Sequence, residues 1–587
     1  MTSRKPALAA RMMRAAWRRM PAKRYDVGWE PGLVVPAADG SPLITDHYFP
    51  CAEGDFPTLL VRSPYGRGLP WSPMYGVLFA EQGFHVVLQS CRGTGGLGSS
   101  GGPGGPGGSG GSGGRFEPWR NEAADARAAV VWLREQSWFN GSLATIGPSY
   151  LGYVQWALAL DPPPELKAMV VQVGLHDPHA FFHAGGVLHL ENALASATGM
   201  TYQSRGTASF VKAMFRLKRR LGEIAGAQPL RGSYVSAIGA EMAWLDEVLT
   251  HSDPDDPYWN GLDLGGVAER LRVPTSLITG WHDALADQTL EQYGRLRRAG
   301  CETALLVGPW THTSALQQGW PEVFAESLAW LRAHLCADPS GLRPTRVRVH
   351  VGGEDAWRDL DDWPLFPATA TATAMTATAA ATAWFPTSDG HLVPQLPAGF
   401  GPQSTNGLDS RSSTGSAPLA SFRYDPADPT PSVGGPLLSP AAGPRDNSAL
   451  EARNDVLTFT GPPLAEPLDL LGPVSARLTL STDTGCTDIV TRLCDVDPQG
   501  RSVNVCEGPA RLRAAGQAPA RLTVPMSATA HRFRAGHRIR WQVSAGAHPR
   551  YARNPGTGEP PLDATHFTAV RVTVHSGSAL LLPSGGV

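Results

Sequence analysis

The stretch LATIGPSYLG, residues 143–152, joins a short apolar run to a segment with helical spacing, residues 154–159. A short apolar run between turn residues predicts a buried strand. Small residues at positions 147 and 152 let the chain turn sharply around Ser149, and the N-terminus of the following helix favours negative charge there. The stretch therefore predicts a strand, a tight turn and a helix that present Ser149 as a nucleophile, although Gly152 lies one position later than in the G-x-S-x-G pattern. The alternative is an ordinary turn between a strand and a helix that contains a serine.

Strands and helices alternate on both sides of this stretch. Short apolar runs predict further buried strands at residues 33–35, 58–61, 85–88, 276–279 and 304–307. Residues 121–138 and 323–335 predict helices, and the spacing in the first of these, which has acids in its first turn, places on one stripe Ala124, Ala128, Val131 and Trp132. Strands that alternate with helices indicate a parallel sheet, so we expect an α/β fold.

Two ionisable residues follow later strands of this sheet. Asp283 ends the segment Gly-Trp-His-Asp after one predicted strand, and His312 ends the segment Gly-Pro-Trp-Thr-His after the next. Because the carboxyl ends of parallel strands lie along one edge of a sheet, Ser149, Asp283 and His312 are expected to converge there. Serine, acid and histidine in this chain order are typical of an α/β-hydrolase catalytic triad, with the histidine as general base and the acid orienting it. His282 is a rival base, but it adjoins the acid and is poorly placed to face Ser149.

The composition changes twice along the chain and divides it into domains. Residues 176–267 favour helices and are rich in His, Ala, Leu and Met, which indicates an insertion into the α/β domain. Later, short alternating segments between Gly, Pro and Asp turns predict an all-β sandwich, in which the Ala/Thr tract at 368–383 favours an edge strand or a linker. We therefore expect a hydrolase domain in two parts, 25–175 and 268–345, a helical cap between them and a jelly-roll sandwich at 346–587.

Two segments lie outside this pattern. Residues 101–114 contain only Gly, Pro and Ser. Such a composition cannot bury enough surface to offset the entropy of ordering it, so we expect a disordered loop there, with a functional lid as the alternative. Residues 1–24 are basic and mildly amphipathic, which predicts a frayed surface helix or tail, with association with a membrane surface as the alternative.

Charge, cysteine content and hydropathy restrict the partners. A formal net charge of −2 gives no reason to expect nucleic acid. Seven cysteines are spread widely without a Cys-x-x-Cys pair, which favours a reducing, cytoplasmic location. No stretch approaches the roughly 20 apolar residues of a membrane span, so we expect no integral membrane segment.

The expected chemistry needs neither a metal nor a cofactor. No cluster of His, Cys and acidic residues has the spacing of a zinc site. His176 and His179, with Asp177 between them, come nearest to a ligand set. We expect these three residues to line the cap or the surface and not to bind a metal.

Several ordered motifs resemble the cocaine esterase and Xaa-Pro dipeptidyl-peptidase family of serine hydrolases. The segments Gly-Pro-Ser-Tyr-Leu-Gly, Gly-Trp-His-Asp and Gly-Pro-Trp-Thr-His are similar to that family's nucleophile, acid and histidine motifs, which places Ser149, Asp283 and His312 in those roles. Further resemblance lies at residues 62–66, 91–95, 253–259, 424–435 and 553–555. One departure is Ser90, which stands before Cys-Arg-Gly where the family usually has an acid.

The resemblance implies a fold and an oxyanion hole. It implies a hydrolase domain, an inserted helical cap and a C-terminal jelly roll. It also implies that the hydroxyl of Tyr65, in the segment Arg-Ser-Pro-Tyr-Gly, and the backbone N–H of Tyr150 bind the oxyanion. The expected reaction is acyl transfer from a small-molecule or short-peptide substrate to Ser149 and then to water. A homo-oligomer is compatible with the sequence.

Substrate class is left open between esters and peptides, with ester hydrolysis favoured. An Xaa-Pro dipeptidyl-peptidase needs a carboxylate for the free amine of its substrate, and Asp177 and Glu191 are the candidates. Trp281 is a further candidate for contact with the substrate. A hypothesis of another class is a catalytically inactive binding module on a hydrolase scaffold, against which the intact set of three catalytic residues argues.

Overall fold

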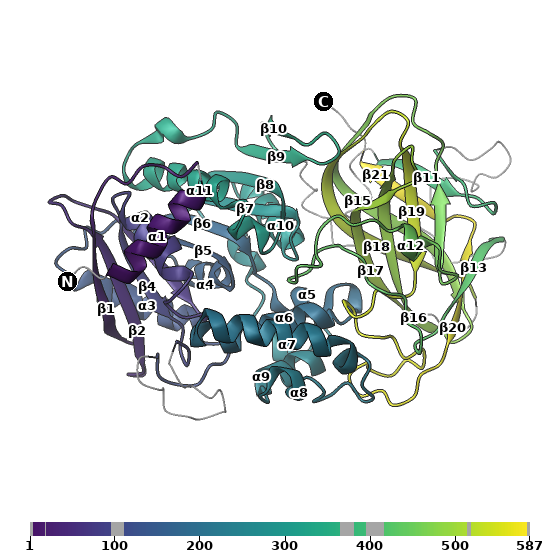
Figure 1. Cartoon of the computed structure of the whole chain (residues 1–587), viewed down its shortest axis with the longest axis horizontal. Coiled ribbons are helices and arrows are strands. Elements are labelled where there is room, and N and C mark those ends of the chain that lie inside the picture. Colours follow the sequence, from purple (N-terminus) through teal and green to yellow (C-terminus); the bar gives the residue numbers. More distant parts are fainter. Residues whose placement is uncertain are drawn as a thin grey trace. The chain divides into compact units, whose positions relative to one another are not determined.

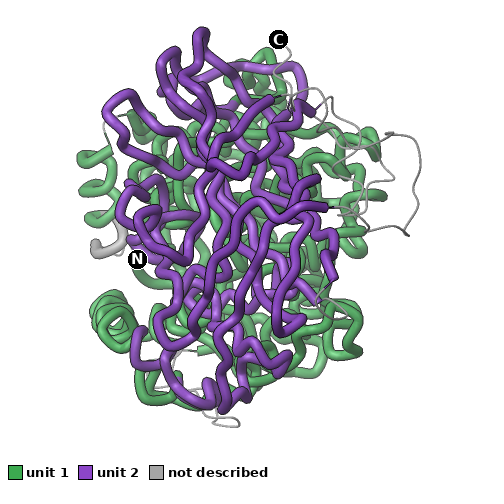
Figure 2. The backbone as a smooth tube through the Cα atoms, turned by 90° about the vertical axis from the view of Figure 1, so that its right-hand side faces the viewer, with its two compact units in different colours: residues 1–181, 193–220, 234–348 green, residues 182–192, 221–233, 349–587 purple. Residues whose placement is uncertain are grey.

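The computed structural model describes residues 4–17, 19–95, 111–363, 381–394, 416–513 and 518–583 (Figure 1). The chain forms two compact units (Figure 2). The first contains residues 1–181, 193–220 and 234–348, and the second contains residues 182–192, 221–233 and 349–587. Among the described residues, no helix has both the length and the apolar character to cross a membrane.

The first unit is built on a mixed sheet whose strands follow the order β1-β2-β4-β3-β5-β6-β7-β8. Neighbours from β4 to β8 pair in parallel, whereas β2 is antiparallel to both β1 and β4. The parallel sheet expected from the sequence is therefore confirmed at the centre and gains an antiparallel edge. The strands are β1 (Val27–Pro36), β2 (Pro42–Pro50), β3 (Thr58–Ser63), β4 (His85–Ser90), β5 (Leu143–Ser149), β6 (Leu166–Gly174), β7 (Thr275–His282) and β8 (Thr303–Thr311).

Helices cover both sides of this sheet, as a buried parallel sheet requires. Helices α4 and α11 both pack on β5 and β6, and Figure 1 shows them on opposite sides of these strands. A large apolar cluster joins alternate strand residues such as Leu59 and Val61 to Phe324 of α11. Outside the range 176–267, the helices of the first unit are α1 (Arg4–Ala16), α2 (Leu78–Ala80), α3 (Glu122–Arg134), α4 (Tyr150–Ala159), α10 (Ala286–Arg298) and α11 (Trp320–Leu335).

Helix α3 exists where the sequence predicts it, but the predicted stripe is wrong. Val131 is 54% exposed, whereas the buried positions are Glu122, Asp125, Ala126, Ala129, Val130 and Leu133. The two acids of the first turn face inward because arginines from other segments neutralise them there. Apolar spacing alone therefore assigned the wrong face.

The N-terminal basic segment forms a helix that is packed rather than frayed. Ala10 of α1 is 1% exposed, Arg14 forms an ion pair with Glu81, and the rings of Trp17 and Trp320 lie 6.1 Å apart. Apolar contacts therefore hold one side of this helix against the first unit. The expectation of a frayed surface helix or tail is wrong in this respect.

The range expected as an inserted cap is helical. It contains α5 (Pro178–His183), α6 (Leu190–Tyr202), α7 (Thr207–Ala225), α8 (Val235–Ile238) and α9 (Ala243–Thr250). The limits 176–267 as a separate domain remain a prediction.

The Gly/Pro/Ser segment is anchored at its C-terminal end. Residues 96–110 lie outside the described part of the chain. Ser112 is buried, its backbone N–H donates to the carbonyl of Thr94 at 2.9 Å, and its hydroxyl donates to the carbonyl of Ser90 at 2.9 Å. Gly93 in turn donates to the carbonyl of Gly113 at 2.9 Å. The expectation of disorder is therefore wrong for residues 111–114.

The second unit is all β apart from short helical segments, as expected. Its two antiparallel sheets bury a common apolar cluster that includes Leu478, Leu493 and Trp541. One sheet contains β11 (Ala381–Pro386), β12 (Leu392–Val393), β13 (Pro418–Tyr424), β15 (Leu468–Thr482), β18 (Ala520–Phe533), β20 (Val570–His575) and β21 (Ala579–Pro583). The other contains β14 (Val456–Thr460), β16 (Cys486–Val496), β17 (Ser502–Arg513) and β19 (Arg538–Ser544).

Three smaller elements complete the chain. β9 (Val347–Val351) spans the boundary between the units and is followed by β10 (Ala356–Leu360), and α12 (Ser448–Glu451) precedes β14. The end of the Ala/Thr tract forms the start of β11, which pairs with β21 and β12 as a strand. The part of that tract before residue 381 lies outside the described residues.

Candidate active site

The serine singled out by the sequence occupies a strained turn. β5 ends at Ser149 and α4 begins at Tyr150. Ser149 has φ 59° and ψ −121°, outside the regions that residues with a side chain ordinarily adopt. Such a conformation persists only where the surrounding structure holds it, and it is typical of functional sites. The turn leaves Ser149 partly exposed at the end of its strand.

Two glycines make this turn possible because they allow close approach of the backbone. A Cβ at Gly147 would lie 2.5 Å from the Cβ of Leu151, and a Cβ at Gly152 would lie 2.8 Å from the Cα of Gly174. Neither contact can be relieved by moving the end of a flexible side chain. The position of the second glycine is therefore determined by the packing of α4 against the end of β6.

Asp283 and His312 form a buried pair. Nδ1 of His312 lies 2.7 Å from Oδ1 of Asp283, and the residues are 8% and 2% exposed, respectively. The Thr279 hydroxyl donates to Oδ2 of Asp283 at 2.8 Å, and the backbone N–H of Leu285 donates to Oδ1 at 3.1 Å. A carboxylate held in this way can accept a proton of the imidazole at Nδ1, which leaves Nε2 for proton transfer.

The sheet order brings these residues to one edge. Ser149 ends β5, Asp283 follows β7 and His312 follows β8, and the strands from β5 to β8 are parallel neighbours. Their carboxyl ends therefore lie along the same edge, where open α/β sheets place their sites. The rival base His282 is the last residue of β7 and pairs with Thr311 in the sheet.

Tyr65 lies beside the serine. Its hydroxyl is 3.5 Å from Oγ of Ser149, and its ring stacks on Trp71 with centroids 5.4 Å apart. Burial raises the pKa of Tyr65 to about 12, against the opposing effect of hydrogen bonds with the Ser149 side chain and the Tyr150 backbone. The hydroxyl therefore keeps its proton at neutral pH and is available as a hydrogen-bond donor next to Ser149.

The candidate residues for substrate contact lie in different settings. Trp281 is a buried residue of β7. Asp177 follows β6, accepts a hydrogen bond from the backbone of Ala180 at 3.2 Å, and has its pKa raised by burial and by Asp263. Glu191 is a buried residue of α6 that belongs to the second unit, and burial raises its pKa.

The two histidines around Asp177 have separate partners. Nδ1 of His176 lies 3.2 Å from Asp263 and its Nε2 lies 3.5 Å from Glu291, whereas Nε2 of His179 lies 3.1 Å from the carbonyl of Ser252. Burial opposes protonation of His176, but the hydrogen bonds with both carboxylates outweigh it and raise its pKa. Within the described ranges, no group of three or more His, Cys, Asp or Glu residues is arranged to hold a metal ion.

Ser90, which stands where the resembled family usually has an acid, shares an arginine with an acid of β2. Arg67 donates from Nη1 to the Ser90 hydroxyl at 2.6 Å and from Nε to Oδ1 of Asp46 at 3.0 Å. Asp46 lies in β2, so the carboxylate partner of this arginine comes from a neighbouring strand. Asp46 could not be predicted from the sequence, because a single acid in a strand carries no signal of its own.

The mixed sheet with covering helices and the serine turn at its edge define an α/β-hydrolase. Residues 39–104 and 105–314 match the family described as X-Pro dipeptidyl-peptidase (S15 family), and residues 341–580 match the X-Pro dipeptidyl-peptidase C-terminal non-catalytic domain. The chain belongs to this family. It is a serine hydrolase that acts as an ester hydrolase or a peptidase, as the sequence predicts.

Individual relatives share the whole architecture. Cocaine esterase of Rhodococcus sp. (strain MB1 Bresler) is 30% identical over 574 residues, which cover 90% of this chain and 92% of that protein. The solved structure of an alpha-amino acid ester hydrolase has a TM-score of 0.75 at 22% identity and covers 96% of this chain and 97% of its own. An aminopeptidase from a marine sediment archaeon, Thaumarchaeota archaeon, has a TM-score of 0.72 at 22% identity, with the same coverage of 96% and 97%. The two solved structures support the fold.

Proposed function

We propose that this protein hydrolyses carboxylic esters through an acyl-enzyme on Ser149. The observation that carries the proposal is the buried pair of His312 and Asp283, at 2.7 Å, on the sheet edge where Ser149 lies 3.5 Å from the Tyr65 hydroxyl. A serine hydroxyl is a weak nucleophile, and a base oriented by an acid is what activates it.

The first half of the reaction forms a bond between Ser149 and the acyl carbon. His312 takes the hydroxyl proton at Nε2 while Oγ attacks the carbonyl, and it then gives the proton to the leaving alcohol. Asp283 holds the imidazole in the tautomer with the proton on Nδ1 and stabilises the imidazolium. In the second half, water attacks the acyl-enzyme with the same base, and Ser149 is regenerated.

The proposed oxyanion hole consists of the Tyr65 hydroxyl and the Tyr150 backbone N–H. The hydroxyl lies next to Ser149 and keeps its proton because burial raises the pKa of Tyr65 to about 12. Tyr150 opens α4, so its amide belongs to the first turn of a helix, where negative charge is favoured. Donors fixed in this way stabilise the charge that develops on the carbonyl oxygen.

Ester hydrolysis is favoured because the relative that is 30% identical to this chain, cocaine esterase, is an esterase. Xaa-Pro dipeptidyl-peptidase activity is the second candidate, because the family is described by it and because Asp177 places a half-buried carboxylate after β6. A carboxylate there would bind the free amine of a short peptide. Asp177 and Trp281, in the first unit, stay predictions for substrate contact, and Glu191, in the second unit, is a separate prediction.

A fluorophosphonate probe tests the nucleophile. Wild-type protein should be labelled, Ser149→Ala should not, and the control Ser252→Ala, which changes an exposed serine, should label as the wild type does. A wild-type protein that stays unlabelled beside a labelled reference esterase would overturn the proposal in favour of an inactive binding module.

A substrate panel tests the reaction class. Short-chain and aromatic p-nitrophenyl esters should give a higher kcat/KM than Xaa-Pro-p-nitroanilides. The reverse preference would favour the dipeptidyl-peptidase. In that case Asp177→Asn should raise KM for the anilides and leave KM for p-nitrophenyl acetate unchanged, because only the anilides carry a free amine.

We also propose a cytoplasmic location and leave assembly to measurement. All seven cysteines are free thiols, as a reducing compartment requires. Fractionation of the native host with a cytoplasmic marker tests the location. Light scattering of the purified protein tests whether it forms a homo-oligomer.

A further inference from the structure

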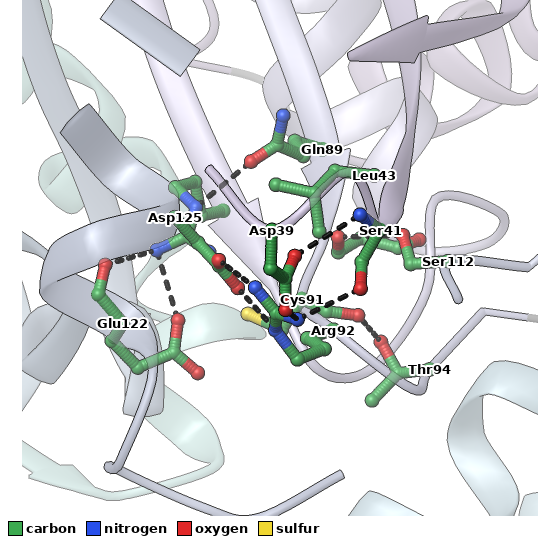
Figure 3. A network of polar contacts seen from close by, with 12 residues as sticks. Asp39, Ser41, Leu43, Gln89, Cys91, Arg92, Thr94, Ser112, Glu122 and Asp125 are labelled. Carbon is green, nitrogen blue, oxygen red and sulfur yellow. Dashed lines mark hydrogen bonds and ion pairs between the residues drawn. The ribbon is translucent and has the colours of Figure 1, made fainter. Parts of the chain in front are cut away.

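A network of polar contacts around Glu122 and Asp125 takes part in no step of the mechanism above (Figure 3). It connects Tyr150 to Glu122 and continues through arginines and a second acid. We propose that Glu122 is a positioning residue for the oxyanion hole, which it serves by holding the Tyr150 hydroxyl and thereby the backbone amide of that residue. This inference rests on the proposed function, because it takes the Tyr150 amide as an oxyanion donor.

Tyr150 is held at both ends. Its backbone begins α4 directly after Ser149, and its side chain is almost completely buried. The hydroxyl donates to Oε1 of Glu122 at 2.8 Å and accepts a hydrogen bond from the backbone N–H of Trp119, also at 2.8 Å. Because the amide and the ring belong to one residue, the hydrogen bonds at the far end of the ring restrict how the first turn of the helix can tilt.

Glu122 is itself fixed by Arg62. One guanidinium nitrogen, Nη1, donates to the backbone carbonyl of Glu122 at 2.9 Å and lies 2.9 Å from its Oε2, while Nε donates to Gln89 at 2.9 Å. Arg62 and Glu122 are 2% and 4% exposed, respectively. A carboxylate held by a buried guanidinium keeps one orientation, so Oε1 stays directed at Tyr150.

The same arginine supports the other proposed donor. Arg62 lies near the end of β3, only three residues before Tyr65. One buried ion pair therefore connects the strand that positions the Tyr65 hydroxyl with the acid that positions the Tyr150 amide. Arg62 thus contacts the acid that holds Tyr150 and lies in the strand that precedes Tyr65. This gives the arginine of the Arg-Ser-Pro-Tyr segment a physical role for both proposed donors.

The rest of the network balances the buried charge. Figure 3 shows Asp125 next to Glu122 and in contact with Arg92. Arg92 donates to both oxygens of Asp125, at 2.6 and 3.2 Å, and Asp125 lies 3.7 Å from Arg62. Arg92 also forms an ion pair with the exposed Asp39 at 2.5 Å, so two guanidinium groups contact three carboxylates, and removing a buried partner of such a set leaves a buried charge without its partner.

Trp119, which hydrogen-bonds to Tyr150, has a strained backbone conformation. Trp119, which is 4% exposed, has φ 69°, a conformation that is costly for a bulky side chain. The backbone N–H of Trp119 is the group that donates to the Tyr150 hydroxyl. The hydrogen bond offsets part of the cost of that conformation, so the strain is located where it helps to hold Tyr150.

Two variants test the positioning role. Glu122→Gln keeps the shape and removes the charge that Arg62 holds, and Tyr150→Phe removes one oxygen atom. Each should lower kcat for a p-nitrophenyl ester about 10- to 100-fold, as misplacement of a catalytic group does, with KM unchanged. The double variant should be no slower than the slower single variant, because both changes break one interaction.

Three further measurements separate positioning from a purely structural role. The affinity for phenylboronic acid, which mimics the tetrahedral intermediate, should fall by the same factor as kcat. The pH at which kcat/KM is half-maximal should stay the same, because His312 is untouched. Tyr153→Phe is the matched control: its hydroxyl, on the same helix, donates to the carbonyl of Leu262 at 3.0 Å, and kcat should stay within about twofold.

The outcomes separate this inference from the proposed function. If wild-type protein neither hydrolyses esters nor reacts with the fluorophosphonate, the proposed function fails. If wild-type protein is active but both variants keep the wild-type kcat, or lose boronic acid affinity and kcat by unrelated factors, the positioning role is wrong. If Glu122→Gln does not fold, Tyr150→Phe and its control decide alone.

Discussion

Nδ1 of His312 and Oδ1 of Asp283 lie 2.7 Å apart, and both side chains are buried. An amide in place of the carboxylate could present its NH2 group to Nδ1. This would favour the tautomer with the proton on Nε2, which cannot act as the base there. We expect Asp283→Asn to lower kcat about 10⁴-fold at pH 7 with little change in KM, measured with a p-nitrophenyl ester. The exposed control Asp255→Asn should keep full activity. A loss smaller than tenfold would show that another residue orients His312.

The Tyr65 hydroxyl, 3.5 Å from Oγ of Ser149, is expected to contribute to kcat and not to substrate binding. Tyr65→Phe should lower kcat about 100- to 1000-fold, as loss of one oxyanion donor does, and Tyr25→Phe should have no such effect. Because the pKa of Tyr65 is raised to about 12 by burial, its ionisation should not reduce wild-type activity at pH 10. A pH–rate profile to pH 10 checks this. A KM effect alone in Tyr65→Phe would move this tyrosine from the oxyanion hole to substrate contact.

The histidines His47 and His85 are expected to make the first unit sensitive to acid. Nε2 of His47 lies 2.9 Å from Nδ1 of His85, so at least one ring must stay neutral. Burial lowers the pKa of both, that of His85 to about 4, to which the neighbouring His47 adds. Both pKa values are therefore below the ordinary 6.5, so the stability from the neutral pair is complete above about pH 6.5 and is lost as the pH falls from there towards 4.

The melting temperature measured across this pH range tests the pair. It should fall for the wild type between pH 6.5 and 4, and the fall should be smaller in His85→Asn, which cannot take up a proton. The exposed control His391→Asn should show the wild-type slope. Equal slopes for the wild type and His85→Asn would assign the acid sensitivity to other groups.

Gly152 is expected to tolerate no side chain. A Cβ there would lie 2.8 Å from the Cα of Gly174, and backbone cannot move aside without displacing β6. Gly152→Ala should therefore lower the free energy of unfolding by about 1–3 kcal/mol, as overpacking does, and reduce fluorophosphonate labelling. Gly222→Ala, in α7, has open space at its Cβ and should be neutral or stabilising. Wild-type stability in the Gly152→Ala variant would show that the turn is less tightly packed than described.

Glu507 is expected to be essential for the stability of the second unit. It forms ion pairs with Arg492 and Arg550, and all three residues are 3% exposed. Glu507→Gln removes the carboxylate that both guanidinium groups contact, which should lower the free energy of unfolding by about 3–5 kcal/mol. Urea unfolding measures the change, and the exposed control Glu466→Gln should shift it by less than about 0.5 kcal/mol. A small effect at Glu507 would mean that solvent reaches the arginines.

The central strands could be predicted because their signal is local. The apolar runs at 58–61, 85–88, 276–279 and 304–307 each fall inside a strand of the sheet. Strand β2 was not predicted, because its residues Thr45, Asp46 and His47 are buried although they are polar. Burial of polar residues depends on partners from other segments, which spacing along one strand cannot show.

The same limit applies to the site. The motifs identified Ser149, Asp283 and His312 as candidates, because each follows a strand and belongs to a short pattern. Glu122 carried no such signal: an acid in the first turn of a helix ordinarily faces solvent and interacts with the helix dipole. Its partner Arg62 lies 60 residues away in the chain, so only the folded structure brings the charges together.

The paired hydrogen bonds between Gly93 and Gly113 and between Thr94 and Ser112 have a consequence for how this chain can vary. They hold residues 93–94, which precede the Gly/Pro/Ser segment, beside residues 112–113 near the end of that segment. The entropy of closing a loop rises only by about 0.6 kcal/mol for each doubling of its length. A change in the number of residues between Thr94 and Ser112 therefore leaves these hydrogen-bonded residues themselves unaltered.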